Sequence, residues 1–171
     1  PIEVINAGIS GHRSNDMLAR FDRDVLQHKP DLVTISVGVN DVWHGFYDNH
    51  PEGDGPGGVK LDDFRINVTS MVDQAQKAGI RVVILSTTLI GEDLGNQENA
   101  KAEGYNKCLR DIARRHKAIF VDLQEPFRTM VKDHQRFVGS GLALTTDGVH
   151  MNPTGNRVMA HAILTSLQVS H

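Results

Sequence analysis

The sequence predicts a doubly wound α/β domain, in which one parallel sheet carries helices on both faces. Short apolar runs alternate along the chain with longer segments whose apolar residues recur at helical spacing. These helical segments are long enough to cross from one parallel strand to the next, which favours a parallel sheet. The 171 residues suit one domain with a sizeable core, and neither a repeat nor a linker interrupts them. We therefore expect residues 1–171 to form a single domain.

Four segments have the composition of strands, and five others carry apolar residues on one helical face. The predicted strands are residues 4–6, 31–38, 81–87 and 118–123, and the predicted helices lie at about residues 14–28, 61–78, 98–116, 126–134 and 153–167. Residues 31–38 are nearly continuously apolar, which is typical of a strand covered on both faces. We expect Ser14 to cap the first helix, Gly79 to close the second and Asn152 to cap the last.

Composition and charge exclude several classes of function. The formal net charge is −3 and no basic cluster occurs, so nothing indicates nucleic-acid binding. No apolar run is long enough to span a bilayer. Cys108 is the only cysteine, which makes an internal disulfide impossible. Its helical spacing with Tyr105, Leu109 and Ile112 favours a buried structural thiol over a nucleophile.

The N-terminal residues leave the cellular location open. The chain begins with Pro1 and is strand-like at once, with neither an initiator methionine nor a leader. Either a precursor was processed or an N-terminal segment is absent, so a cytoplasmic and a secreted location fit equally. The sequence leaves the oligomeric state open as well.

The spacing of candidate ligands favours neither a metal site nor a phosphate site. The nine histidines include no His-x₃-His or His-Glu-x-x-His pair. Residues 43–58 are polar and glycine-rich, but Val59 stands where an EF-hand counted from Asp48 needs a glutamate. The same Val59 replaces the lysine that a phosphate loop built on Gly53 and Gly58 would need. We expect a surface loop or lid here, and a site that uses no metal or cofactor.

The strongest candidate chemistry lies in residues 147–150, Asp-Gly-Val-His. A carboxylate three residues from an imidazole can fix the tautomer of the ring and stabilise its protonated form, as a general base requires. The helix predicted to start after Asn152 holds this loop against a rigid element. Asp147 and His150 are therefore candidates for proton transfer.

Gly11 and Asn40 follow predicted strands, whose carboxyl ends meet at one edge of such a sheet. Gly11 can present a bare backbone N–H to a developing oxyanion, and Asn40 can donate a side-chain N–H to the same oxygen. Taken singly, Gly11 could be a turn glycine, Asn40 a strand-end cap and His150 a loop histidine. Their coincidence at strand ends favours acyl transfer.

These segments resemble the SGNH (GDSL-type) hydrolases over nearly the whole chain. Residues 6–11 (Asn-Ala-Gly-Ile-Ser-Gly), 38–41 (Gly-Val-Asn-Asp) and 147–150 look like that family's second, third and fifth blocks. The resemblance implies a three-layer, flavodoxin-like α/β fold and metal-free hydrolysis of small esters. It also implies that Gly11 and Asn40 are oxyanion donors, His150 the base and Asp147 its orienting partner.

The first block of that family, Gly-Asp-Ser, is absent from these residues. None of the eight serines follows Gly-Asp: Ser10, Ser14, Ser36, Ser70, Ser86, Ser140, Ser166 and Ser170. Ser10 comes nearest, but His12 occupies the position where a nucleophile elbow needs its second glycine. We expect the nucleophile on an N-terminal first strand outside residues 1–171. Flavodoxin-like order places that strand between residues 4–6 and 31–38.

Three functions are compatible with these residues. The first hypothesis is an esterase or deacylase for small acyl esters, with acetyl groups on carbohydrates as one candidate substrate. The second is an inactive binding module that keeps the pocket but lacks the nucleophile. The third, direct activation of water by His150, lacks both covalent catalysis and a metal and ranks last.

Overall fold

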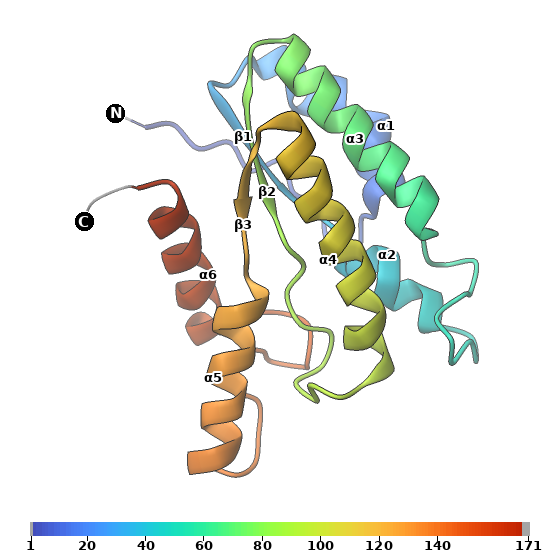
Figure 1. Ribbon diagram of the computed structural model, residues 1–171, viewed down its shortest axis with the longest axis vertical. Coiled ribbons are helices and arrows are strands. Elements are labelled where there is room, and N and C mark those ends of the chain that lie inside the picture. Colours follow the sequence, from blue (N-terminus) through green and yellow to red (C-terminus); the bar gives the residue numbers. More distant parts are fainter. Residues whose placement is uncertain (1, 169–171) are drawn as a thin grey trace.

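A parallel sheet lies between two layers of helices in the computed structural model, which describes residues 2–168 (Figure 1). Both ends of the expected domain, and Ser170 with them, lie outside the described residues. The elements are α1 (Ser14–Asp24), η1 (Leu26–His28), β1 (Leu32–Ser36), α2 (Val39–Trp43), η2 (His44–Phe46), α3 (Leu61–Lys77), β2 (Arg81–Leu85), α4 (Gln97–His116), β3 (Ile119–Val121), α5 (Gln124–Phe137) and α6 (Pro153–Ser166).

The strands of the described residues run parallel in the order β1-β2-β3. Ile84 in the central strand β2 pairs with Ile35 of β1 and with Phe120 of β3. Successive side chains of a strand point to opposite faces. Ile84 accordingly joins the hydrophobic cluster on one face, and Val83 and Leu85 join the cluster on the other.

Helices cover both faces of the sheet, as predicted. The first cluster packs α1, α3 and α4 against the sheet around Phe64, Met71 and Leu109. The second packs α5 and α6 around Phe127 and Leu144. Figure 1 shows the two layers, with α5 and α6 on one side of the strands and α3 and α4 on the other. Cys108 is buried in the first cluster, which confirms the predicted burial of its thiol.

Two of the three predicted helix caps are confirmed. The helix predicted at 126–134 is longer at both ends, because α5 spans Gln124–Phe137. Asn152 caps α6, because its side-chain oxygen accepts the N–H groups of Thr154 and Gly155. Gly79, with φ +78°, follows α3 as the predicted closing glycine. Ser14 is not the cap of α1: Arg13 is, and Ser14 is the first residue inside the helix.

The prediction of a strand at residues 4–6 is wrong. These residues pair with no strand among those described, and Val4 is 85% exposed. A strand depends on hydrogen bonds to a neighbour, so composition alone cannot form one. β1 is not covered on both faces as predicted, because Thr34 and Ser36, which point to the same face, are exposed. It is also an edge strand among those described, since it pairs only with β2.

Candidate active site

Asp147 and His150 form a hydrogen-bonded pair on the loop that precedes α6. One carboxylate oxygen, Oδ2, lies 2.7 Å from His150 Nδ1. The other, Oδ1, accepts the backbone N–H groups of Val149 and His150 at 3.0 and 2.8 Å. The turn and the ring are therefore fixed by the same carboxylate, as the spacing of the two residues predicted. The His150 side chain is 62% exposed, so its imidazole is accessible to a substrate.

These hydrogen bonds stabilise the ionised form of Asp147. The backbone N–H of His150, then that of Val149, then the His150 side chain lower the pKa of the Asp147 carboxyl from 3.8 to about 2. Asp147 is consequently a carboxylate at neutral pH. It can accept the Nδ1 proton, which leaves Nε2 of the neutral ring free to receive another.

The 147–150 turn is fixed at both ends to its surroundings. The Gly148 N–H donates to Thr145 Oγ1 at 3.1 Å, and the Thr146 N–H donates to the His150 carbonyl at 2.8 Å. The Gly148 carbonyl in turn accepts the N–H of Gly91 at 2.7 Å. Since Gly91 belongs to the loop that leaves the carboxyl end of β2, the turn is tied to the sheet edge (Figure 1).

Asn40 lies in the first turn of α2, directly after β1, and faces the segment that contains Gly11. Its Nδ2 donates one hydrogen bond to the His12 carbonyl at 3.0 Å. An amide nitrogen carries two protons, so this bond orients the group and leaves the second N–H for a ligand. Gly11 has φ +80°, a conformation that favours glycine, and its N–H has no partner among residues 2–168.

Asp41, which the sequence analysis did not single out, holds the Gly11 segment from the other side. The residue is 1% exposed, and its Oδ1 accepts the N–H of Ser14 at 2.9 Å. Burial raises the pKa of this carboxyl, against the hydrogen bonds from Ser14 that lower it. Arg13 adds a hydrogen bond to the Gly57 carbonyl at 2.7 Å. In the sequence Asp41 stands out only as the last residue of the 38–41 block, which does not reveal that its carboxylate binds the first residue of α1.

The two halves of the candidate site lie at the carboxyl ends of adjacent strands. Gly38, between β1 and α2, has φ +120°, and a Cβ there would lie 2.7 Å from Thr87 Cγ2 of the chain leaving β2. Glycine therefore permits the close approach of the two strand ends. The structure joins Asn40 to the Gly11 segment and Asp147 to His150. No hydrogen bond between described residues links the first pair to the second.

Aromatic residues continue the chain directly after Asn40. Trp43 ends α2, and the ring of His44 stacks on that of Tyr47 with centroids 5.0 Å apart. Burial, followed by the charge of Arg13, lowers the pKa of His44. The predicted loop at 43–58 is thus helical at its start, through α2 and η2.

Residues 2–168, the part of the chain that the structure describes, lack two kinds of feature. No cluster of three or more His, Cys, Asp or Glu side chains in this part of the chain has the geometry to hold a metal ion. None of its helices combines the length and the apolar character needed to cross a membrane.

Comparisons with known proteins agree on one family. Residues 1–158 match the model of the GDSL-like Lipase/Acylhydrolase family. An acetylxylan esterase from Geobacillus stearothermophilus is 31% identical over 171 residues, which cover 95% of this chain and 71% of that protein. An isoamyl acetate-hydrolyzing esterase from Saccharomyces cerevisiae is 24% identical over 177 residues, covering 95% of this chain and 68% of that protein.

Solved structures agree with the fold. The acetyl xylan esterase AlAXEase superposes with a TM-score of 0.86 at 30% identity, covering 96% of this chain and 81% of that one. A catalytic mutant of the Geobacillus enzyme superposes with a TM-score of 0.84 at 26% identity, covering 97% of this chain and 72% of that one. Catalytic mutants of that enzyme replace a serine, an aspartate or a histidine, the last two lying three positions apart. The predicted parallel α/β fold is confirmed.

We predict that the Asp147 carboxyl titrates near pH 2 in the folded protein, as followed by NMR of its carboxyl carbon. The folded-state pKa lies below the ordinary 3.8, so the stabilisation of the turn is complete above a pH of about 4 and is lost as the pH falls toward 2. His150→Gln should keep most of the shift, because the backbone N–H of residue 150 is its largest cause. A midpoint at 3.8 or above would contradict the turn geometry.

Proposed function

The chain belongs to the GDSL-like lipase/acylhydrolase family and is a carboxylic ester hydrolase, and we propose that it cleaves small acyl esters with a Ser-His-Asp triad. In this triad His150 is the general base and Asp147 orients it. The serine nucleophile is contributed by a segment outside residues 1–171.

The observation that carries the proposal is the contact of 2.7 Å between Asp147 Oδ2 and His150 Nδ1. A carboxylate on Nδ1 sets the tautomer in which Nε2 can take a proton. Among the described residues no side chain bonds to Nε2, and the ring is accessible. Further support comes from the Geobacillus esterase, whose catalytic mutants include an aspartate and a histidine at the same spacing.

Gly11 and Asn40 are the proposed oxyanion donors. The Gly11 N–H and the second N–H of Asn40 are both available for a ligand oxygen. Preorganised donors of this kind stabilise the charge that develops on the carbonyl oxygen during acyl transfer. The contacts of Asn40 and Asp41 with residues 12–14 hold the Gly11 segment in place before a substrate binds.

The nucleophile is placed outside residues 1–171 on two grounds. These residues contain no Gly-Asp-Ser, and no serine hydroxyl of the part described in the structure bonds to the His150 ring. β1 is an edge strand among those described, and residues 4–6 pair with no described strand. Flavodoxin-like order puts one more strand between these two segments. We place the serine on a strand in that position, as the order of the family fold predicts.

The reaction then proceeds in two halves. The serine hydroxyl attacks the ester carbonyl while its proton passes to His150 Nε2, and Gly11 and Asn40 hold the resulting oxyanion. The protonated His150 returns the proton to the leaving alcohol as the C–O bond breaks, which leaves an acyl-enzyme. Water attacks this intermediate and gives its proton to His150. The tetrahedral intermediate formed by this attack then breaks down and releases the acid, and His150 returns the proton to the serine.

Acetyl is the proposed acyl group. The two relatives compared by sequence are named for acetylxylan and for isoamyl acetate, which are acetyl esters of different alcohols. We therefore propose acetyl esters as the substrate class, with acetylated carbohydrate as one candidate.

His150→Ala should abolish ester hydrolysis in the full-length protein while leaving its fold intact, because the side chain is exposed on a loop. The expected loss in kcat is at least about 10⁴-fold on p-nitrophenyl acetate and on acetylated xylo-oligosaccharide. His28→Ala, on an exposed residue of η1, is the matched control and should keep wild-type rates. An enzyme that keeps most of its rate after His150→Ala would rule out the assignment of the base.

Asn40→Ala should lower kcat by roughly 10²–10³-fold with little change in KM, since an oxyanion donor acts in the transition state. Steady-state kinetics on the same esters measure both constants. Asn15→Ala, at an exposed position of α1, is the control for loss of an amide elsewhere. Unchanged kcat in Asn40→Ala would mean that other groups hold the oxyanion.

A further inference from the structure

A buried carboxylate beside the active-site turn has no place in the mechanism above. Glu92 is 7% exposed and lies on the loop between β2 and α4. Its two oxygens accept the backbone N–H groups of Ala143, Leu144 and Thr145 at 2.6, 2.9 and 2.8 Å. Glu92 Oε1 also accepts the Thr145 hydroxyl at 2.6 Å. Four donors from one short segment therefore converge on a single side chain.

The carboxylate of Glu92 is held as an anion by hydrogen bonds alone. Burial raises its pKa, but the Thr145 hydroxyl and the three backbone N–H groups outweigh burial and lower the pKa below its ordinary value. No ion pair of the described residues includes Glu92. A buried charge that depends on three successive backbone N–H groups fixes the conformation of the segment that supplies them.

This segment leads directly into the Asp147–His150 turn. Thr145 Oγ1 donates to Glu92 and accepts the N–H of Gly148 at 3.1 Å. The carbonyl of Gly148 accepts the N–H of Gly91 at 2.7 Å. Residues 91 and 92 thus bind the chain on both sides of Asp147.

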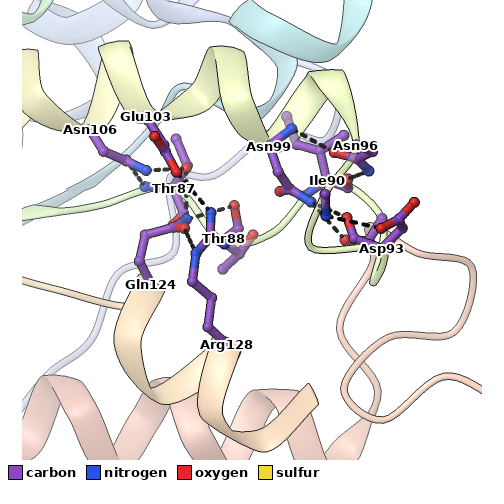
Figure 2. Close-up of polar contacts among 12 residues, drawn as sticks. Thr87, Thr88, Ile90, Asp93, Asn96, Asn99, Glu103, Asn106, Gln124 and Arg128 are labelled. Atoms are coloured by element: carbon purple, nitrogen blue, oxygen red, sulfur yellow. Dashed lines mark hydrogen bonds and ion pairs between the residues drawn. The ribbon is translucent and has the colours of Figure 1, made fainter. Parts of the chain in front are cut away.

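The loop that carries Glu92 is itself fixed to the start of α4 by the side chains of Asn96 and Asn99 (Figure 2). Asn99 Oδ1 accepts the Ile90 N–H at 2.9 Å, and its Nδ2 donates to the carbonyls of Gly91 and Asp93. Asn96 Nδ2 adds a bond to the Ile90 carbonyl at 2.7 Å. Because α4 packs against the sheet, these amides place Gly91 and Glu92 relative to the strand ends.

A second set of amides holds the start of the same loop. Asn106 Oδ1 accepts the Thr87 N–H at 2.8 Å, and Gln124 Nε2 donates to the Thr87 carbonyl at 2.9 Å. Figure 2 shows Asn106 and Gln124 approaching Thr87 from α4 and from α5. The loop is therefore held at its start, at Thr87, and again at residues 90–93.

We propose that Glu92 is a positioning residue for the Asp147–His150 pair, acting through the backbone of residues 143–145 and the hydroxyl of Thr145. Glu92 does not touch the substrate. It holds the turn in the one arrangement in which the Asp147 carboxylate meets His150 Nδ1. This inference rests on the proposed roles of Asp147 and His150, but its structural readout does not need catalysis.

The test compares Glu92→Gln with the wild type in the full-length protein. A glutamine presents an NH₂ group to donors that need an acceptor, so the segment must shift. We expect kcat for acetyl esters to fall roughly 10²-fold with KM little changed, as a misplaced base predicts. Nitrogen-15 NMR of the neutral imidazole should show His150 losing its preference for the Nδ1–H tautomer.

A second pair of variants keeps the test decisive if Glu92→Gln does not fold. Thr145→Val removes the hydroxyl while keeping the shape of the side chain, and it should lower kcat and shift the His150 tautomer in the same direction. Thr145→Ser restores the hydroxyl and should restore both readouts. Gln135→Ala is the matched control, because Gln135 donates only to the Glu92 backbone carbonyl at 3.0 Å, and it should leave both readouts unchanged.

The outcomes separate positioning from structural support. Loss of the tautomer preference in Glu92→Gln or Thr145→Val, with rescue by Thr145→Ser, supports the proposal. A lower Tm with unchanged kcat and unchanged tautomer overturns it and leaves Glu92 a purely structural residue. A wild-type protein without esterase activity would contradict the proposed function, while the tautomer would still report whether Glu92 positions the pair.

Discussion

One carboxylate holds the Asp147–His150 turn, the candidate active site, together. Asp147 receives two backbone N–H groups on Oδ1 and the His150 ring on Oδ2, so the fold of the turn and the orientation of the imidazole depend on the same charge. The same hydrogen bonds lower the pKa of Asp147, and the backbone N–H of His150 lowers it more than the His150 ring does. A base that must accept and return a proton in each half-reaction needs such a partner, because its own charge changes during the cycle.

The parallel sheet relates this turn to the proposed oxyanion donors, Gly11 and Asn40. Asn40 follows β1, the Gly91–Glu92 loop follows β2, and Gly38 lets the two strand ends approach each other. Buried polar groups then fix each segment to a rigid helix: Asp41 binds the first residue of α1, and Asn99 of α4 binds the loop after β2. The amide of Asn99 suits this purpose because all of its hydrogen-bonding groups are paired. Asp41 binds through Oδ1 alone, and its buried Oδ2 has no partner among the described residues, which is costly.

The sequence was sufficient where structure depends on local chemistry. Asn152 caps α6 because its side chain reaches the nearby N–H groups of Thr154 and Gly155. Asp147 meets His150 because the two lie three positions apart in the chain. It was insufficient where structure depends on distant partners. Residues 4–6 have strand composition but no strand to pair with among the described residues, and the contacts of Glu92 with residues 143–145 cross about fifty positions of sequence. Ser14 shows the same limit, because Asp41 binds its N–H from another element.

The central claim is that His150 serves a serine that lies outside residues 1–171. The most direct measurement is to label the full-length protein with a serine-reactive fluorophosphonate and to map the adduct by peptide mass spectrometry. The account predicts a single adduct on a serine outside residues 1–171, and no adduct after His150→Ala. An adduct on Ser10, Ser36 or any other serine within residues 1–171 would contradict it, as would full ester hydrolysis by a protein that takes up no label.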